Sequence, residues 1–255
     1  LYTSSGAIAT VLCAKASQAI TFPAIPDQWT TNRYQLTDSA SSGLSVSFSV
    51  FSGPAVLSNG TNLSFTTAGA VSILATQSGS DNWNPAAAVT NSFNVLLTPQ
   101  GALTFAPTSP QVYNTTNTLS ASGGSGTGSV TYAVASGPGV LVGADGLKML
   151  AGTGSVSVVA TKAADALYDS VASTASVAAA KAGQTIPFPA IADQLTTNNA
   201  GLAATASSGL AVSFNVFSGP ATLAEGTNLT FTTAGIVAIV ASQAGDDNWA
   251  VAPEV

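Results

Sequence analysis

Large apolar residues alternate with small polar residues over short stretches of this chain. Residues 46–50 read Val-Ser-Phe-Ser-Val, and residues 63–65, 71–73 and 93–95 follow the same pattern. A period of two places one side of each stretch in a core and the other in water, which is typical of β-strands. Turn pairs such as Ser42-Gly43 and Asn59-Gly60 separate the stretches. The pattern predicts seven strands in about 83 residues, near 19–22, 35–40, 45–51, 54–57, 62–66, 69–77 and 91–97. No window has sustained helical periodicity, and 163–168 could form one helical turn at most.

The same pattern recurs along the chain. Residues 18–89 align without a gap with residues 184–255 at a constant offset of 166, and most aligned residues are identical. Both copies contain Ser-Ser-Gly-Leu, Val-Phe-Ser-Gly-Pro and Asp-Asn-Trp. Internal repetition of this kind indicates an array of modules rather than a single catalytic pocket.

A weaker copy lies between the two. Val134–Pro138 resembles Val50–Pro54, and residues 154–161 resemble 69–76. The chain is therefore expected to be an A-B-A array, with an A module at 18–99, a B module at 100–183 and a second A module at 184–255. Residues 1–17 align with 167–183, so they are expected to be the last strand of a preceding B module or a donor strand.

The second A module stops at Val255, the counterpart of Val89, and so lacks the alternating strand near 91–97. Two explanations stay open. The chain is a window on a longer tandem array, or residues 1–17 of one subunit complete the last module of its neighbour, with Ile8, Val11 and Cys13 as donor-strand candidates. Repeated donation would give a head-to-tail filament, because a heterologous contact that does not close propagates.

Charged residues are scarce, at 6% of the chain, and the net charge is −6. A globular chain usually carries about 25%. The five basic residues are scattered, so no nucleic-acid footprint is present. No run of about 18 apolar residues occurs, so membrane insertion is not expected.

Seven antiparallel strands, each with one polar face, predict an all-β fold of tandem immunoglobulin-like β-sandwich modules. The segments Ala204–Phe214, Gly226–Phe231 and Ala241–Trp249 resemble the bacterial immunoglobulin-like (Big/MBG-type) tandem repeats of large cell-surface or extracellular proteins. Such repeats serve as stalks, adhesins or fibre subunits outside the cell. The resemblance implies no catalytic residues.

The residue content excludes several kinds of chemistry. The chain has no histidine, so it cannot form a Ser-His-Asp triad or a zinc site of the usual Cys/His type. No cofactor is expected, although loop oxygens at Asp81, Asp246 and Asp247 make calcium a candidate beside a turn-capping role. Cys13 is the only cysteine and is expected to be a buried thiol, with an intermolecular bridge as the alternative.

Aromatic residues raise two further possibilities. Trp83, Tyr168 and Trp249 follow the sixth predicted strand of each module and are expected to close one end of the sandwich, or to stack on sugars. Trp29, Arg33 and Tyr34 stand where the second A module has Leu195, Asn199 and Ala200. Aromatic and arginine side chains often dominate contacts, so these three are candidates for a subunit or partner contact.

Together these features predict a non-enzymatic, extracellular or cell-surface structural protein. It would be a fibre or stalk whose partners are copies of itself or adjacent modules of the same chain. The alternative is an adhesin that binds a glycan or a protein on a host or neighbouring cell.

Overall fold

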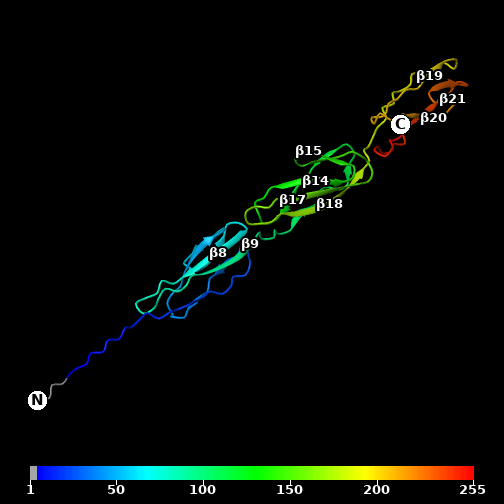
Figure 1. The fold of residues 1–255 in the computed structure, drawn as a ribbon. Helices are drawn as coiled ribbons and strands as arrows, with labels where there is room; N and C mark the ends of the chain where they lie inside the picture. Colours follow the sequence, from blue (N-terminus) through cyan, green and yellow to red (C-terminus); the bar gives the residue numbers. More distant parts are fainter. Residues whose placement is uncertain (1–4) are drawn as a thin grey trace. The chain divides into compact units, whose positions relative to one another are not determined.

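The computed structural model describes residues 5–255, and in this part of the chain every regular element is a β-strand (Figure 1). The chain forms two compact units. One comprises the chain up to Ala102 with Gly124–Gly128 and Ala163–Val171, and the other comprises Leu103–Gly123, Ser129–Lys162 and Ala172–Val255. Below, the names first A module, B module and second A module denote residues 18–99, 100–183 and 184–255.

The first A module contains nine strands: β1 (Ile20–Thr21), β2 (Gln28–Trp29), β3 (Arg33–Gln35), β4 (Ser39–Ala40), β5 (Ser47–Ser52), β6 (Ala55–Ser58), β7 (Asn62–Phe65), β8 (Gly69–Thr76) and β9 (Val89–Leu96). They form sheets of order β2-β9-β8-β5 and β3-β7-β6, with a separate β1-β4 pair. In the four-stranded sheet β9 runs parallel to β2 and antiparallel to β8, so the last strand lies between the two.

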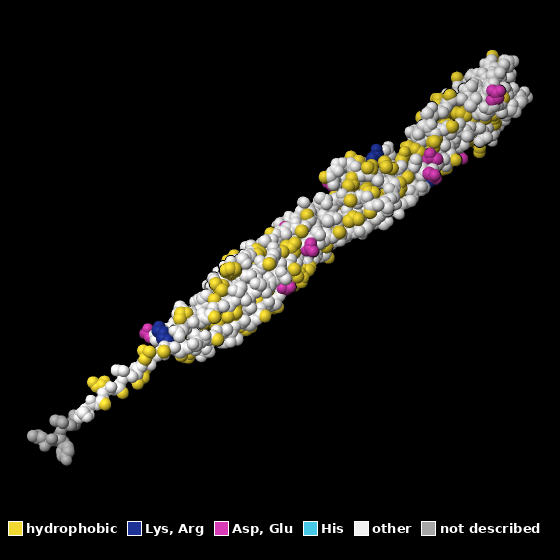
Figure 2. Space-filling view, in the orientation of Figure 1, with side chains coloured by type: hydrophobic (Ala, Val, Ile, Leu, Met, Phe, Trp, Pro, Cys, Tyr) yellow, Lys and Arg dark blue, Asp and Glu magenta, His cyan; other side chains and the backbone are white. Residues whose placement is uncertain are grey.

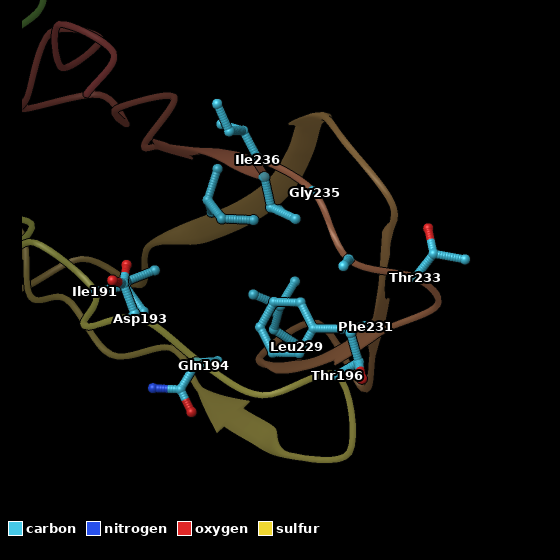
Figure 3. A pocket seen from close by; sticks show the side chains of 12 residues that line it. Ile191, Asp193, Gln194, Thr196, Leu229, Phe231, Thr233, Gly235 and Ile236 are labelled. Carbon is cyan, nitrogen blue, oxygen red and sulfur yellow. The ribbon is translucent and has the colours of Figure 1, made fainter.

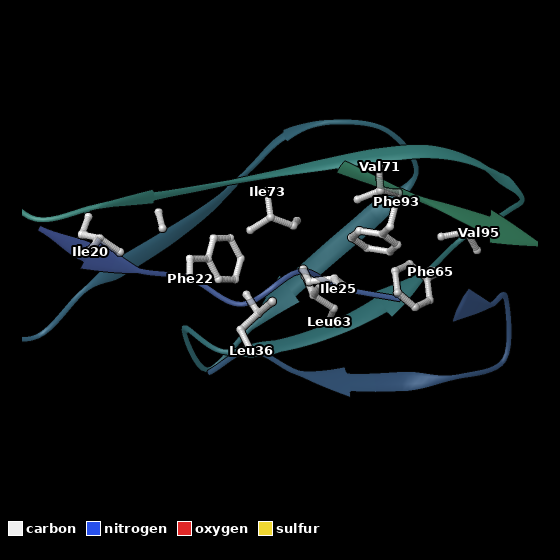
Figure 4. Packing of buried hydrophobic residues seen from close by; sticks show 11 residues of the cluster. Ile20, Phe22, Ile25, Leu36, Leu63, Phe65, Val71, Ile73, Phe93 and Val95 are labelled. Atoms are coloured by element: carbon white, nitrogen blue, oxygen red, sulfur yellow. The ribbon is translucent and has the colours of Figure 1, made fainter. Parts of the chain in front are cut away.

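The two sheets enclose one apolar core (Figure 4). Val71, Ile73 and Phe93 come from the four-stranded sheet, and Leu63 and Phe65 come from the three-stranded sheet. The rings of Phe65 and Phe93 meet edge to face across the core, with centroids 5.9 Å apart. A core held between two sheets makes this an immunoglobulin-like β-sandwich, as the alternation of the sequence predicts.

One predicted strand is wrong. Residues 35–40 do not form a single strand, because β3 pairs with β7 whereas β4 pairs with β1. The backbone leaves one sheet after Gln35 and joins another at Ser39, and Leu36 between them enters the core. Residues 163–168 contain no helical turn and form a bend whose loop meets the linker before the B module.

The B module has the same sheet orders: β11-β18-β17-β14, β12-β16-β15 and a β10-β13 pair. Its strands are β10 (Leu103–Phe105), β11 (Gln111–Val112), β12 (Thr116–Thr118), β13 (Ala121–Gly123), β14 (Val130–Ser136), β15 (Gly139–Val142), β16 (Gly146–Met149), β17 (Ser155–Lys162) and β18 (Val171–Ala180). Val156, Val158 and Val177 are fully buried in its core.

The second A module has fewer paired strands: β19 (Asn199–Gly201), β20 (Ser213–Ser218), β21 (Ala221–Ala224), β22 (Asn228–Phe231) and β23 (Ala238–Ser242). They form sheets of order β19-β22-β21 and β20-β23. Residues 194–195 and 235–237, the counterparts of β2 and of the start of β8, are not in strands, because no counterpart of β9 pairs with them.

A β-bulge followed by Gly-Pro recurs in every module. The register shifts between Val50 and Ser52 opposite β8, and equivalent shifts occur in β14 and β20. Gly53 follows the bulge with φ of 96°, and a Cβ there would lie 2.1 Å from the carbonyl oxygen of Ala70. The repeated Ser-Gly-Pro is therefore required by the backbone path, because only glycine fits this close approach.

Candidate functional sites

The residue two positions before the start of each module is held by backbone hydrogen bonds from the loop that follows the sixth predicted strand. In the first A module the N–H of Ala16 donates to the carbonyl of Asn82 at 2.9 Å, and the N–H of Asn84 donates back to the carbonyl of Ala16 at 2.8 Å. Thr98 is held in the same way by Leu167 and Asp169, and Ala182 by Asn248 and Ala250. We call each set a linker clamp. Each forms a short parallel bridge.

A glutamine network supports the linker clamps of both A modules. Gln18 Nε2 donates to Gln77 Oε1 at 2.5 Å and to the carbonyl of Asn84 at 2.7 Å, and Ser42 donates to Gln18 Oε1. Gln184, Gln243 and Ser208 repeat these contacts in the second A module. The network joins the first residue of each A module to its clamp loop, so the linker cannot leave without breaking several hydrogen bonds.

The B module builds its clamp loop around a carboxylate. Asp165 accepts hydrogen bonds from the backbone N–H of Thr127, Leu167 and Tyr168, at 2.5, 2.9 and 2.8 Å. These donors, with Thr127 contributing most, hold the pKa of Asp165 well below its usual range. Asp165 is therefore ionised at neutral pH and fixes the loop that holds Thr98.

The clamp loops of the B module and of the second A module also contact the end of the preceding module. The Thr30 hydroxyl donates to the carbonyl of Leu167 and contacts the Thr98 hydroxyl at 3.0 Å. The ring of Tyr113 meets Trp249 edge to face, with centroids 5.8 Å apart. Trp83, Tyr168 and Trp249 are all half-buried. The backbone of each clamp loop, which contains one of these aromatic residues, hydrogen-bonds the linker residue. The sequence did not indicate this role.

A second candidate site is an open strand position in the second A module (Figure 3). A cavity of about 490 Å³ lies between residues 191–196 on one side and residues 229–239 on the other. In the first A module the equivalent space holds β9, with Phe93 and Val95 pointing inward. Ile191 is consequently 41% exposed, whereas its counterpart Ile25 is 6% exposed. The cavity opens onto the core of the sandwich.

The predicted donor segment is extended and unpaired between residues 5 and 15, while residues 1–4 lie outside the described residues. Ile8, Val11 and Cys13 are all exposed, so the expectation of a buried Cys13 thiol is wrong. The thiol has no core to enter, because residues 5–14 pair with no strand among the described residues. Val11 and Cys13 share one face of an extended backbone, and Ile8 lies on the other.

The three calcium candidates lie in loops, where one caps a turn and the other two are exposed. Asp246 Oδ1 accepts from the N–H of Asn248 and of Trp249, both at 2.8 Å, which is an Asx turn. Asp81 and Asp247 are exposed. Within residues 5–255, no group of three His, Cys, Asp or Glu side chains could hold a metal ion.

The structure places the three contact candidates on strands of different sheets. Trp29 is exposed on β2 and pairs with Leu96, which is also exposed. Arg33 and Tyr34 lie on β3 and border a hollow of about 300 Å³ with Asn59 and Asn62. Tyr34 also packs against the core, so only part of its ring is accessible.

The surface between these sites carries few charges (Figure 2). Charged side chains are few on the face shown there, and apolar and neutral polar atoms cover most of it. Among residues 5–255, no helix could cross a membrane.

Several solved structures align with most of this chain. Drosophila N-cadherin EC1-3 is 10% identical, with 91% of this chain and 96% of that chain covered and a TM-score of 0.37. Mouse cadherin-23 EC22-24 is 9% identical, with 92% and 97% covered and a TM-score of 0.33. The human desmocollin-1 ectodomain is 10% identical, with 88% and 58% covered and a TM-score of 0.31. No protein-family model and no curated protein sequence matches the chain. The fold assignment rests on the strand pairing and cores described above.

Proposed function

We propose that this protein is an extracellular structural fibre or stalk. Its immunoglobulin-like modules are joined by linkers that the linker clamps hold in place through hydrogen bonds. The observation that carries the proposal is the linker clamp, which recurs before all three modules with the same pair of backbone hydrogen bonds. A linker residue whose N–H and C=O are both hydrogen-bonded has little torsional freedom. Such a residue limits the rotation of one module relative to the next. The cell-surface location follows from the resemblance of the repeat motifs.

Removing one bond of a linker clamp tests this function. Ala182→Pro deletes the N–H that donates to Asn248, whereas Gly183→Pro is the matched control, because Pro99 already occupies that place after Thr98. We expect small-angle X-ray scattering and ¹⁵N relaxation to show loosely coupled modules for Ala182→Pro and coupled modules for the wild type and Gly183→Pro. Independent tumbling of the wild-type modules would refute a stalk.

A head-to-tail filament is the form of fibre that the open strand position favours. The apolar side chains of Leu229, Phe231 and Ile239 that line the cavity are costly to leave in water, and a strand from a second copy would cover them. Electron microscopy of the concentrated chain tests this form directly, and we expect unbranched filaments. A chain that stays monomeric at all concentrations would contradict it.

An adhesin is the second candidate, and the exposed Trp29–Leu96 pair favours it. Substitution of Trp29 and Arg33 by alanine separates the two roles. In an adhesin the variant loses attachment to glycan- or protein-coated surfaces and still forms fibres. In a fibre whose subunits touch through these residues, assembly weakens instead.

A further inference from the structure

The strongest unexplained feature of the surface is a set of large apolar side chains in contact with water. Ile8, Val11, Leu12 and Ile236 are 93, 85, 93 and 91% exposed, more than any other large apolar side chain of the described chain. Three lie in the extended segment that begins at residue 5, and the fourth lies on the edge of the open strand position. Surfaces of this kind mark binding sites, and here the two are complementary: one is an unpaired strand and the other lacks a strand.

We infer that residues 8–14 of a second copy of this chain fill the open strand position in one defined register. This inference rests on the proposed filament and specifies its contact. The strand runs antiparallel to residues 236–240 and parallel to residues 194–196, as β9 does between β8 and β2.

The repeat fixes the register. Gln28 pairs with Val95 in the first A module, and its counterpart Gln111 pairs with Ala179 in the B module. Residues 5–14 align with β18 at the offset of 166, so Cys13 corresponds to Ala179 and thus to Val95. Val11 then corresponds to Phe93 and points into the cavity toward Phe231, and Cys13 takes the place of Val95.

The outward face of the strand gains apolar partners in the same register. Ala70 pairs with Asn94 in the first A module, and the corresponding pair between copies is Ile236 with Leu12. Leu74 pairs with Thr90, and the corresponding pair is Val240 with Ile8. In the first A module each of these two pairs contains one polar residue, whereas both pairs between copies are wholly apolar. Packing between facing side chains on neighbouring strands favours the apolar pairs.

A side-chain acceptor for a backbone N–H is also available at the required place. Asp27 Oδ1 accepts from the N–H of Asn94 at 2.7 Å, and Ser109 accepts from the N–H of Ala178 in the B module. Asp193, the counterpart of Asp27, lines the cavity and has no hydrogen-bond partner among the described residues. In the inferred register it accepts from the N–H of Leu12. Val255 already pairs with Ala241 as Val89 pairs with Ala75, so the incoming strand begins at Ile8.

Disulfide trapping tests both the partner and the register. In a Cys13→Ser background, Leu12→Cys with Ile236→Cys places two exposed thiols directly opposite each other in neighbouring copies. Leu12→Cys with Val240→Cys is the matched control, because Val240 lies four residues along the same edge, about 13 Å away. After mild oxidation of the full chain we expect the first variant to form a ladder of multiples of 25 kDa on non-reducing gels, and the control to remain monomeric.

A labelled synthetic peptide of residues 5–17 gives a second measurement that does not depend on the cysteine variants. We expect it to bind the wild-type chain and to shorten the filaments, and the Val11→Asp peptide to bind about 100-fold more weakly because a carboxylate would enter the cavity. Absence of a ladder, equal ladders in both cysteine variants, or no peptide binding because residues beyond Val255 fill the position would each overturn the inference. If the modules still tumble together in those cases, the proposed stalk function remains supported and only the strand exchange is refuted.

Discussion

At the residue scale, the hydrogen bonding of one glutamine, which occurs in all three modules, distinguishes the B module from the two A modules. Gln28 Oε1 accepts from Asn32 Nδ2 at 3.1 Å, and Gln194 Oε1 accepts from Asn198 at 3.3 Å. In the B module Thr115 stands in place of the asparagine, and its hydroxyl donates to the carbonyl of Val112 instead. Gln111 is 1% exposed, and its Oε1 has no hydrogen-bond partner among the described residues. A buried acceptor without a donor weakens the fold.

Thr115→Asn is therefore expected to stabilise the B module. The new amide can reach Gln111 Oε1 as Asn32 reaches Gln28, which should contribute about 1 kcal/mol net of the lost hydroxyl bond. Hydrogen exchange at Val158 and Val177 measures the change within this module. Thr115→Ala is the control and should be neutral or destabilising, and a Thr115→Asn variant no more protected than Thr115→Ala would contradict the assignment.

At the scale of elements, the same loop after the sixth predicted strand is stabilised in two ways. The A modules use neutral Gln18–Gln77 and Gln184–Gln243 pairs, whereas the B module uses the ionised Asp165. The linker clamp that results is the same in all three, because the bonds to the linker come from the backbone. The B clamp is therefore expected to be more sensitive to acid than the clamp of the first A module, whose loop is capped by the Ser80 hydroxyl instead of a carboxylate.

This difference predicts a pH dependence for the B clamp. The pKa of Asp165 is lower in the folded chain than in the unfolded chain, so its contribution is complete above about pH 4 and is lost as the pH falls further. We expect the amides of Thr127, Leu167 and Tyr168 to lose protection below pH 4 while the Asn82 loop does not. Asp165→Asn should expose these amides already at neutral pH, whereas Asp169→Asn, which removes a single local bond, should not.

At the scale of the whole molecule, two modules of nearly the same sequence differ in how completely their cores are covered. Val71 and Ile73 are fully buried on β8 beside β9, whereas their counterparts Val237 and Ile239 are partly exposed beside the cavity. Stability in a module array is approximately a sum of module and interface contributions, so an incomplete module weakens locally.

We therefore expect the second A module to open first. Backbone amides of residues 237–241 should exchange faster than those of residues 71–75 in the same molecule, and the first A module provides the internal reference. The peptide of residues 5–17 should slow exchange in the second A module only. Equal exchange rates in the two modules without the peptide would show that the open position carries no energetic cost.

Alternation of apolar and small polar residues, with turn pairs at regular spacing, was enough to predict most strands and the sandwich, because burial of one strand face is a local pattern. The repeat offset was enough to show that the printed sequence holds no second copy of the strand near 91–97 in its last module. The sequence did not show that residues 35–40 divide between two sheets or that Cys13 is exposed. It also did not show that the backbone of each clamp loop hydrogen-bonds the linker. These depend on which strands pair across long separations and on hydrogen bonds from N–H and C=O groups, which every residue except proline carries and no residue pattern marks. The match between Leu12 and Ile236 likewise appears only when the register of β8 and β9 is known.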